Sequence, residues 1–206
     1  MATRGRFITL EGIDGAGKSS HVEFLRGRIA ARGAEVVVTR EPGGTPFGER
    51  LREVVLHHDA PPFAEAIAMF ADRSAHLAEV IEPALAAGRW VVCDRFSDST
   101  YAYQCGGRGV DRDAVRALEH LVHPHLQPDA TFLFDVDPAL AAQRQRARSS
   151  APDKFEREQA DFFRRVRDAY LERAREFPRR IHVVDASGDL EAVRAGLAAA
   201  FARAFP

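Results

Sequence analysis

The chain has 206 residues, enough for a single domain with a substantial core. Its formal net charge of -1 argues against a general nucleic-acid binder, and no apolar run is long enough to span a membrane. Its two cysteines, Cys93 and Cys105, form neither a C-x-x-C pair nor a metal-binding spacing, so we expect a reducing, cytoplasmic location.

The first predicted strand, residues 7–10, leads into a phosphate-binding sequence. Residues 12–19 fit the P-loop pattern G-x-x-x-x-G-K-[ST], and a helical pattern with Val22, Leu25 and Ile29 on one face follows them. Glycines let backbone N–H groups approach a polyphosphate, and the helix points its positive end at the same anion. The pattern predicts that Lys18 reaches the β- and γ-phosphates of a nucleotide and that Ser19 ligates magnesium.

The remaining chain alternates short apolar strands with helical patterns. Further strands are expected at residues 35–39, 90–93, 131–134 and 181–184. Helices are expected at about 46–55, 63–87, 111–122, 138–148 and 156–177, and from about 190 onward. Loops are expected at 40–45, 57–62 and 97–109. This alternation predicts an α/β fold, a five-stranded parallel sheet with helices on both faces, in one domain spanning residues 1–206.

Polar residues follow most of the predicted strands. Parallel sheets bind their ligands at the carboxyl ends of the strands, where such residues gather. The candidates are Asp14, Arg40, Glu41, Asp94, Arg95, Asp135 and Asp185.

A P-loop alone does not distinguish a nucleotide switch from a phosphotransferase. A guanine-nucleotide switch normally carries N-K-x-D or T-K-x-D, but this chain has no asparagine and neither lysine follows a threonine. A motor or transport ATPase usually belongs to a larger assembly. The short length and an internal arginine-rich segment favour a small kinase that closes over two nucleotides.

Several longer stretches together resemble the bacterial thymidylate kinases (dTMP kinases), over essentially the whole chain. They are residues 7–19 (with E-G-x-D-G-x-G-K-S), 39–45 (T-R-E-P-G-G-T), 94–96 (D-R-F), 99–104 (S-T-Y-A-Y-Q), 106–109 (G-G-R-G) and 153–156 (D-K-F-E). The resemblance implies a P-loop NTPase-type fold and transfer of the γ-phosphoryl group of ATP to dTMP, with Mg²⁺. It also implies a homodimer, the usual form in this family.

The resemblance also implies which residues bind dTMP. Arg95 resembles the arginine that holds the dTMP phosphate, and Asp14 the carboxylate near that phosphate, the sugar and the metal. Phe70 and Arg73 resemble the pair that stacks on thymine and binds its carbonyl, but their spacing leaves open whether Phe70 or Met69 covers the base. The full expected set of substrate-binding residues is Asp14, Glu41, Arg52, Phe70, Arg73, Arg95, Ser99, Thr100, Tyr103 and Gln104. Of these, Thr100 and Gln104 are expected to bind the base, and Tyr103 to stand where a ribose 2′-hydroxyl would go.

A second implied set binds ATP, Mg²⁺ and the transferred phosphoryl group. The expected ATP-binding residues are Gly12, Ile13, Asp14, Gly15, Ala16, Gly17, Lys18, Ser19, Ser20 and Arg144, and the expected metal ligands are Ser19, Asp14 and Asp94. The expected catalytic residues are Lys18, Asp14, Arg95, Arg148 and Lys154. We expect the loop at residues 185–188 to bind the adenine of ATP.

A lid is expected at about residues 142–156. Some thymidylate kinases carry an arginine directly after the P-loop aspartate, where this chain has Gly15. The resemblance to the bacterial subgroup with a basic lid therefore favours Arg148 or Lys154 as donors of the missing positive charge. Two alternatives stay open: a deoxynucleoside or other small-molecule P-loop kinase with Glu41 as its base, and a nucleotide switch without turnover.

Overall fold

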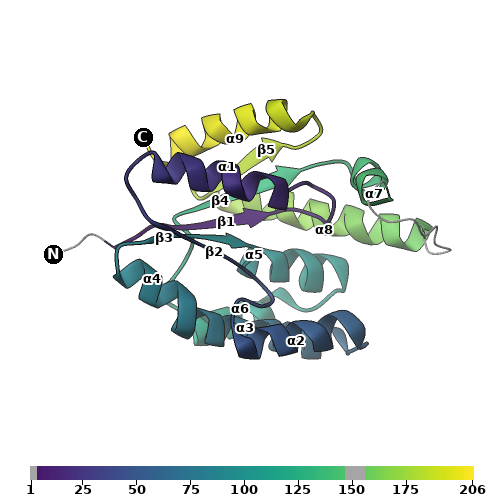
Figure 1. The fold of residues 1–206 in the computed structure, drawn as a ribbon. Coiled ribbons are helices and arrows are strands. Elements are labelled where there is room, and N and C mark those ends of the chain that lie inside the picture. Colours follow the sequence, from purple (N-terminus) through teal and green to yellow (C-terminus); the bar gives the residue numbers. More distant parts are fainter. Residues whose placement is uncertain (1–3, 147–155) are drawn as a thin grey trace.

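The computed structural model describes residues 4–146 and 156–206 (Figure 1). Within them lies one five-stranded sheet, in which all neighbouring strands are parallel and the order is β2-β3-β1-β4-β5. The strands are β1 (Phe7–Glu11), β2 (Val36–Arg40), β3 (Trp90–Asp94), β4 (Ala130–Asp135) and β5 (Ile181–Asp185). Each coincides with a predicted strand to within one residue at either end, so the predicted α/β fold is confirmed.

Helices cover both faces of this sheet. Helices α1 (Ser19–Ala30) and α9 (Leu190–Ala204) lie together on one face (Figure 1). The other face carries α3 (Pro62–His76), the π-helical segment η1 (Leu77–Ile81) and α4 (Glu82–Ala86), which together form the long helix predicted at 63–87. Further helices are α2 (Pro46–His57), α6 (Arg112–Val122), α7 (Pro138–Arg146) and α8 (Glu156–Glu176).

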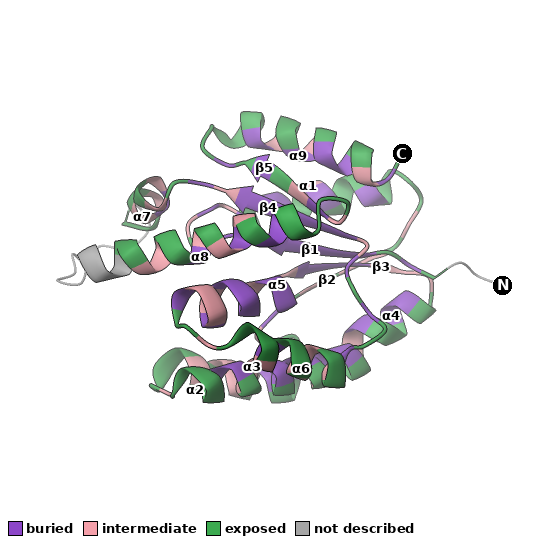
Figure 2. Ribbon diagram, turned by 180° about the vertical axis from the view of Figure 1, so that it is seen from behind, coloured by how far each residue is buried: buried purple, intermediate pink, exposed green. Residues whose placement is uncertain are grey.

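Burial follows the amphipathic pattern that a layered fold requires. All five residues of β1 are buried, as expected for a central strand covered on both faces. The helices turn buried residues toward the sheet and exposed residues to the solvent (Figure 2). In α1, Leu25 and Ile29 are fully buried. No helix in the described part of the chain is both long and apolar enough to cross a membrane.

The loop predicted at 97–109 is wrong for most of its length. Residues 97–107 form a helix, α5 (Ser97–Thr100), continued by the π-helical segment η2 (Tyr101–Gly107). Two glycines at its end let η2 approach α8: a Cβ on Gly106 would lie 2.5 Å from the Cβ of Ala169, and one on Gly107 would lie 2.4 Å from the ring of Phe162. Tertiary packing therefore overrides the weak helix propensity of this aromatic and glycine-rich stretch.

Candidate active site

The P-loop connects the carboxyl end of β1 to the first turn of α1. Its glycines Gly12, Gly15 and Gly17 have positive φ angles of 137°, 85° and 90°. A Cβ on Gly12 would lie 2.5 Å from the carbonyl oxygen of Phe134, so only glycine fits there. This conformation places the loop against the N-terminus of α1, the arrangement that binds phosphate groups.

Lys18 folds back over the P-loop. Its Nζ donates hydrogen bonds to the carbonyl oxygens of Gly12 at 2.9 Å and Ile13 at 3.3 Å, and the residue is only 6% exposed. Burial and the positive charge of Arg95 lower the pKa of Lys18 to about 8, although Asp94 and other nearby carboxylates oppose this. The amine is therefore mainly protonated at pH 7, and can act as a cation beside a phosphate.

A cavity of about 180 Å³ opens directly in front of the P-loop, and we call it the phosphate cradle. It is lined by Asp14, Gly15, Gly17, Lys18, Ser19, Arg40, Glu41, Arg52, Asp94 and Arg95. Oδ1 of Asp94 is buried and has no hydrogen-bond partner among the residues that the structure describes. Carboxylate and hydroxyl oxygens are the ligands that Mg²⁺ prefers, so Asp94, Asp14 and Ser19 fit a magnesium ion.

Arg95 stands between the cradle and a second cavity. It is the one non-glycine residue with positive φ, 72°, among those described. Its guanidinium donates to Asp14 Oδ1 at 2.5 Å and to Ser99 Oγ, Tyr103 Oη and Tyr170 Oη at 3.1 Å each. Its ion-pair partner is thus Asp14 and not the adjacent Asp94. Burial raises the pKa of Asp14, but the charges of Arg95 and Lys18 outweigh it, so this pKa lies below its ordinary value.

The second cavity has a volume of about 390 Å³, and we call it the acceptor cavity. It shares Asp14, Glu41, Arg52 and Arg95 with the phosphate cradle. Its other lining residues are Pro42, Val55, Leu56, Glu65, Met69, Arg73, Phe96, Ser99, Thr100, Tyr103, Gln104, Arg108, Phe162 and Phe163. Nine of the ten expected substrate-binding residues therefore surround this cavity.

Phe70 is the exception: its side chain lies in the core and not in the wall of this cavity, so of the two candidates for covering the base only Met69 faces the cavity. The residue is 2% exposed and packs in a cluster with Tyr101 and Val115, while its neighbour Met69 lines the acceptor cavity. Phe70 still touches the site indirectly, because the guanidinium of Arg73 lies 4.7 Å from the centre of its ring. The side chains of residues 69 and 70 point about 100° apart around the helix axis. One of these two neighbouring positions therefore faces the cavity while the other faces the core.

Arg73 belongs to a buried polar network at the rear of the acceptor cavity. Its Nε donates to Glu41 Oε2 at 2.8 Å and its Nη2 to Thr100 Oγ1 at 3.2 Å. His76 Nδ1 lies 3.0 Å from Glu41 Oε1, and Nε2 of the same ring lies 2.6 Å from Thr39 Oγ1. Both oxygens of Glu41 are therefore occupied, which leaves this carboxylate poorly placed to act as a base for a hydroxyl acceptor.

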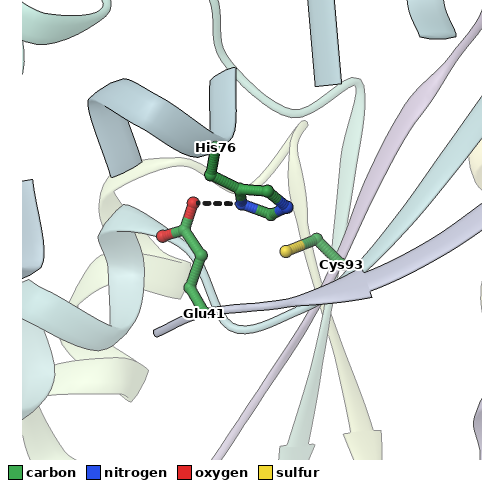
Figure 3. Close-up of side chains that lie close together, drawn as sticks. All are labelled: Glu41, His76 and Cys93. Atoms are coloured by element: carbon green, nitrogen blue, oxygen red, sulfur yellow. Dashed lines mark hydrogen bonds and ion pairs between the residues drawn. The ribbon is translucent and has the colours of Figure 1, made fainter. Parts of the chain in front are cut away.

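Glu41 and His76 also lie close to Cys93, and potential ligand atoms of the three residues fall within 4.8 Å of one another (Figure 3). A metal would have to break the Glu41–His76 bond and the bond from Cys93 Sγ to the Arg95 carbonyl oxygen, 3.0 Å. Burial, with the charges of Glu41 and Asp94, raises the pKa of the Cys93 thiol well above its ordinary value, which disfavours the thiolate that metals bind. We therefore interpret the trio as structural support for the loop after β2.

Three further residues that were expected to bind dTMP or ATP are Arg52, Arg144 and Ser20. Arg52 lines both cavities and donates from Nη1 to the carbonyl oxygen of Pro42 at 2.9 Å. Arg144, at the end of α7, donates to the carbonyl oxygens of Ala186, Ser187 and Gly188, so it holds the loop expected to bind adenine. Ser20 is exposed in the first turn of α1. Arg148 and Lys154 lie outside the described residues.

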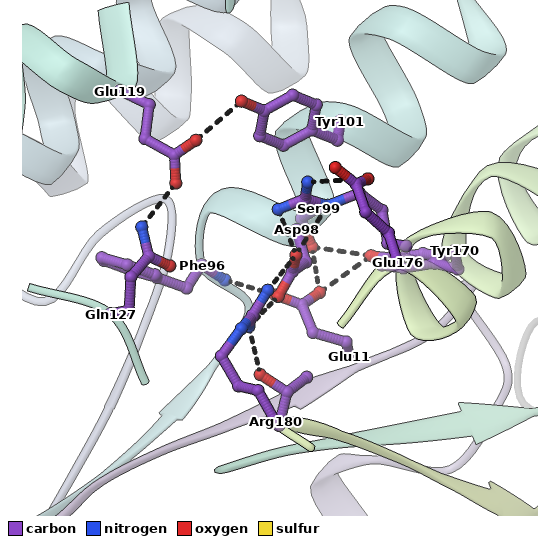
Figure 4. A network of polar contacts seen from close by, with 12 residues as sticks. Glu11, Phe96, Asp98, Ser99, Tyr101, Glu119, Gln127, Tyr170, Glu176 and Arg180 are labelled. Atoms are coloured by element: carbon purple, nitrogen blue, oxygen red, sulfur yellow. Dashed lines mark hydrogen bonds and ion pairs between the residues drawn. The ribbon is translucent and has the colours of Figure 1, made fainter. Parts of the chain in front are cut away.

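Two functional candidates, Glu11 and Tyr170, were not expected. Glu11 is completely buried at the end of β1 and accepts from Phe96 N at 2.8 Å, Ser99 Oγ at 2.6 Å and Tyr170 Oη at 2.9 Å (Figure 4). The Tyr170 hydroxyl also accepts a hydrogen bond from Arg95, so Glu11 helps to hold the Arg95 side chain in place through Tyr170. Glu11 stands in the E-G-x-D-G stretch, which was a signal in the sequence, whereas Tyr170 lies in α8 without a motif.

The buried Glu11 carboxyl predicts a dependence of stability on pH. Burial and the neighbouring charge of Asp98 raise its pKa from 4.5 to about 7. The folded state therefore keeps a proton that the unfolded state has lost, so this group stabilises the fold below about pH 4.5 and loses that contribution as pH rises to about 7. At about 1.4 kcal/mol per pH unit, the loss reaches about 3 kcal/mol at most. Glu11→Gln cannot titrate and should lack this loss.

The measurement is the free energy of unfolding by urea at several values between pH 4.5 and pH 7.5 for the wild type and Glu11→Gln. The difference between the two should change in favour of the variant as pH rises. Glu23→Gln, which changes an exposed carboxylate on α1, is the matched control and should follow the wild type. Parallel curves for the wild type and Glu11→Gln would show that Glu11 is ionised across this range.

A larger groove of about 990 Å³ lies elsewhere, between α6 and the end of α8. Of the arginines that line it, Arg112 pairs with Glu172 at 2.7 Å, and Arg173 and Arg180 pair with the buried Asp98. Because these charges are neutralised and the P-loop is absent from its lining, we place the chemistry in the phosphate cradle and the acceptor cavity.

Comparisons with known proteins agree with this geometry. The family model described as thymidylate kinase matches residues 10–196. The thymidylate kinase of Methylobacillus flagellatus is 58% identical over 191 residues, covering 93% of this chain and 94% of that protein. That of Thiobacillus denitrificans is 55% identical over 198 residues, with 96% and 97% covered. The crystal structure of thymidylate kinase from Ehrlichia chaffeensis superposes with a TM-score of 0.79 at 32% identity, covering 97% of this chain and 99% of that one. The chain therefore belongs to the thymidylate kinase family.

Proposed function

We propose that this protein transfers the γ-phosphoryl group of ATP to dTMP, giving dTDP and ADP. The relatives named thymidylate kinase support this activity. The observation that carries the proposal is the junction of two cavities at Asp14, Arg52 and Arg95. One cavity has the P-loop of a phosphoryl donor site, and the other is large enough for a nucleotide and has arginines at the junction. Two phosphate groups would thus meet at this boundary.

The residues suit direct in-line transfer, which depends on positioning and charge neutralisation rather than on a covalent intermediate. The P-loop amides and Lys18 would hold the donor phosphates. Arg95, braced by Tyr170 and Ser99, would present its planar fork to the acceptor phosphate, which suits a guanidinium better than an ammonium. Asp14 fixes the other side of that guanidinium and supplies an oxygen near the metal position.

Mg²⁺ would be held by Ser19, Asp94 and Asp14, and it supplies neutralisation of the charge on the phosphate oxygens. The P-loop itself contributes one cationic side chain, Lys18, because Gly15 has no side chain. We infer that a second cation comes from the predicted lid, with Arg148 and Lys154 as the leading donors. Their sequence positions, next to the helix that carries Arg144, support this assignment.

The test is a coupled assay of ADP release with ATP, Mg²⁺ and one of three additions: dTMP, thymidine or no acceptor. We expect ADP release that depends on dTMP. Release with thymidine alone would favour a nucleoside kinase, a reading that the occupied Glu41 carboxylate already opposes. Nucleotide binding without ADP release in any mixture would favour a switch protein.

We also propose a homodimer, with a surface on α2, α3 and α6. Exposed large apolar side chains are concentrated on these three helices: Phe47, Val54, Phe63, Ile67 and Leu121. A second copy of the chain would bury them. Sedimentation equilibrium at micromolar concentration should give twice the chain mass, and the mass of a single chain would contradict the dimer. A cytoplasmic location, where ATP and dTMP occur, would suit the two free cysteines.

A further inference from the structure

Gln104 lies in the wall of the acceptor cavity and is held by a second residue of that wall. The side chain, in η2, donates from Nε2 to Glu65 Oε1 at 2.7 Å. Glu65, in the first turn of α3, is only 8% exposed. Its other carboxylate oxygen lies 3.3 Å from Nη2 of Arg108, which comes from the G-G-R-G stretch. Arg108, Glu65 and Gln104 thus form a network of three polar side chains in the wall of the cavity.

This network fixes which end of the Gln104 amide faces the cavity. A carboxylate accepts hydrogen bonds but does not donate them, and the Glu65 carboxylate forms an ion pair with Arg108. The amide nitrogen must therefore point to Glu65, which turns Oε1 away from it. Gln104 Oε1 accepts no hydrogen bond from the described residues, so it is available as an acceptor to a molecule in the cavity.

Arg73 supplies the opposite polarity nearby. Its Nε is occupied by Glu41 and its Nη2 by Thr100, four residues before Gln104 in the same helical stretch. Nη1 of Arg73 has no partner among the described residues. Both residues line the cavity, so its wall carries an acceptor, Gln104 Oε1, and a donor group, the Arg73 guanidinium, and neighbouring side chains hold both in place.

A thymine ring matches this polarity and a cytosine ring does not. Thymine presents the N3–H donor beside the O4 acceptor, whereas cytosine presents an N3 acceptor beside an N4 amine donor. A cytosine edge would set an acceptor against the Gln104 acceptor and a donor against the Arg73 donor, which would leave buried polar groups unpaired. We propose that Glu65 is a specificity-determining positioning residue: by orienting the Gln104 amide, it makes the acceptor cavity accept a thymine-type edge and reject a cytosine-type edge. This inference rests on the proposed function.

The decisive variant is Glu65→Gln, which preserves size but adds a donor. Its amide nitrogen can donate to Gln104 Oε1, so Gln104 can turn over and present its own NH₂ group to the base. We measure kcat/KM for dTMP and for dCMP with saturating ATP and Mg²⁺. The dTMP-to-dCMP ratio should fall by about tenfold or more, the scale of one base-edge hydrogen-bond pair. Glu79→Gln, an exposed change farther along the same long helix, should keep the wild-type ratio.

A merely structural role would lower activity with both nucleotides and leave their ratio unchanged, and that outcome would overturn the inference. Gln104→Leu provides a second test, because it removes the reading group while Glu65 stays in place. Its ratio should also fall, and an unchanged ratio there would equally overturn the inference. A wild type that does not phosphorylate dTMP would instead overturn the proposed function, and the base preference with it.

Discussion

Lys18→Ala should lower the rate of phosphoryl transfer by at least about a hundredfold, the scale seen when one preorganised charge-stabilising group is removed. Lys18 is the cation within the P-loop, and its Nζ lies over the carbonyl oxygens of Gly12 and Ile13. Its loss leaves charge on the transferred phosphoryl group without its partner from the loop. The fold should survive, because the hydrogen bonds that Lys18 makes are confined to the loop itself.

The measurement is single-turnover formation of dTDP, with thermal unfolding recorded in parallel. Arg26→Ala is the matched control, since it removes an exposed cation from the same helix α1. Both variants should keep a melting temperature close to that of the wild type. A Lys18→Ala rate within a few fold of the wild type would exclude this lysine from the phosphate site.

Arg95→Ala should lower kcat/KM for dTMP by roughly 30-fold to several thousand-fold. The bound acceptor phosphate would form a buried, hydrogen-bonded charge pair with Arg95. Removing one partner of such a pair costs about 2–5 kcal/mol, and about 1.4 kcal/mol corresponds to a factor of ten. In this structure the loss has two parts. The acceptor phosphate loses a bidentate donor, and Asp14 keeps a negative charge without its ion-pair partner. Arg95→Lys should recover only part of the activity, because an ammonium lacks the planar fork.

Steady-state kinetics with dTMP varied at saturating ATP will test this expectation. Arg203→Ala removes an exposed arginine near the C-terminal end of α9, where the chain ends on the side of the sheet away from α7 (Figure 1), and it should leave kcat/KM unchanged. If Arg95→Ala raises only the KM for ATP, the guanidinium belongs to the donor site and the assignment of the two cavities is wrong.

Local patterns in the sequence were enough to predict the fold class, and they marked the stretch that we propose as the phosphate site. The P-loop glycines and Lys18 occur within eight residues, and a strand and a helix flank them as the motif requires. Each strand was predicted because a short apolar run is bounded by polar or breaker residues. The same local logic placed Arg95 directly after β3, at the edge of the sheet where ligands bind.

Only the tertiary structure decided which side chains meet. The helix at 97–107 forms against α8, which is about 60 residues away in sequence, and a local pattern does not contain that contact. Likewise, Met69 and Phe70 are both apolar. Which of them faces the cavity and which faces the core depends on how α3 is rotated against its neighbours. Glu11, Tyr170 and Glu65 act through partners 39 to 159 residues away. Such partnerships depend on long-range packing and on burial, which sets the charge of a carboxyl group, and neither can be read from the spacing of residues along the chain.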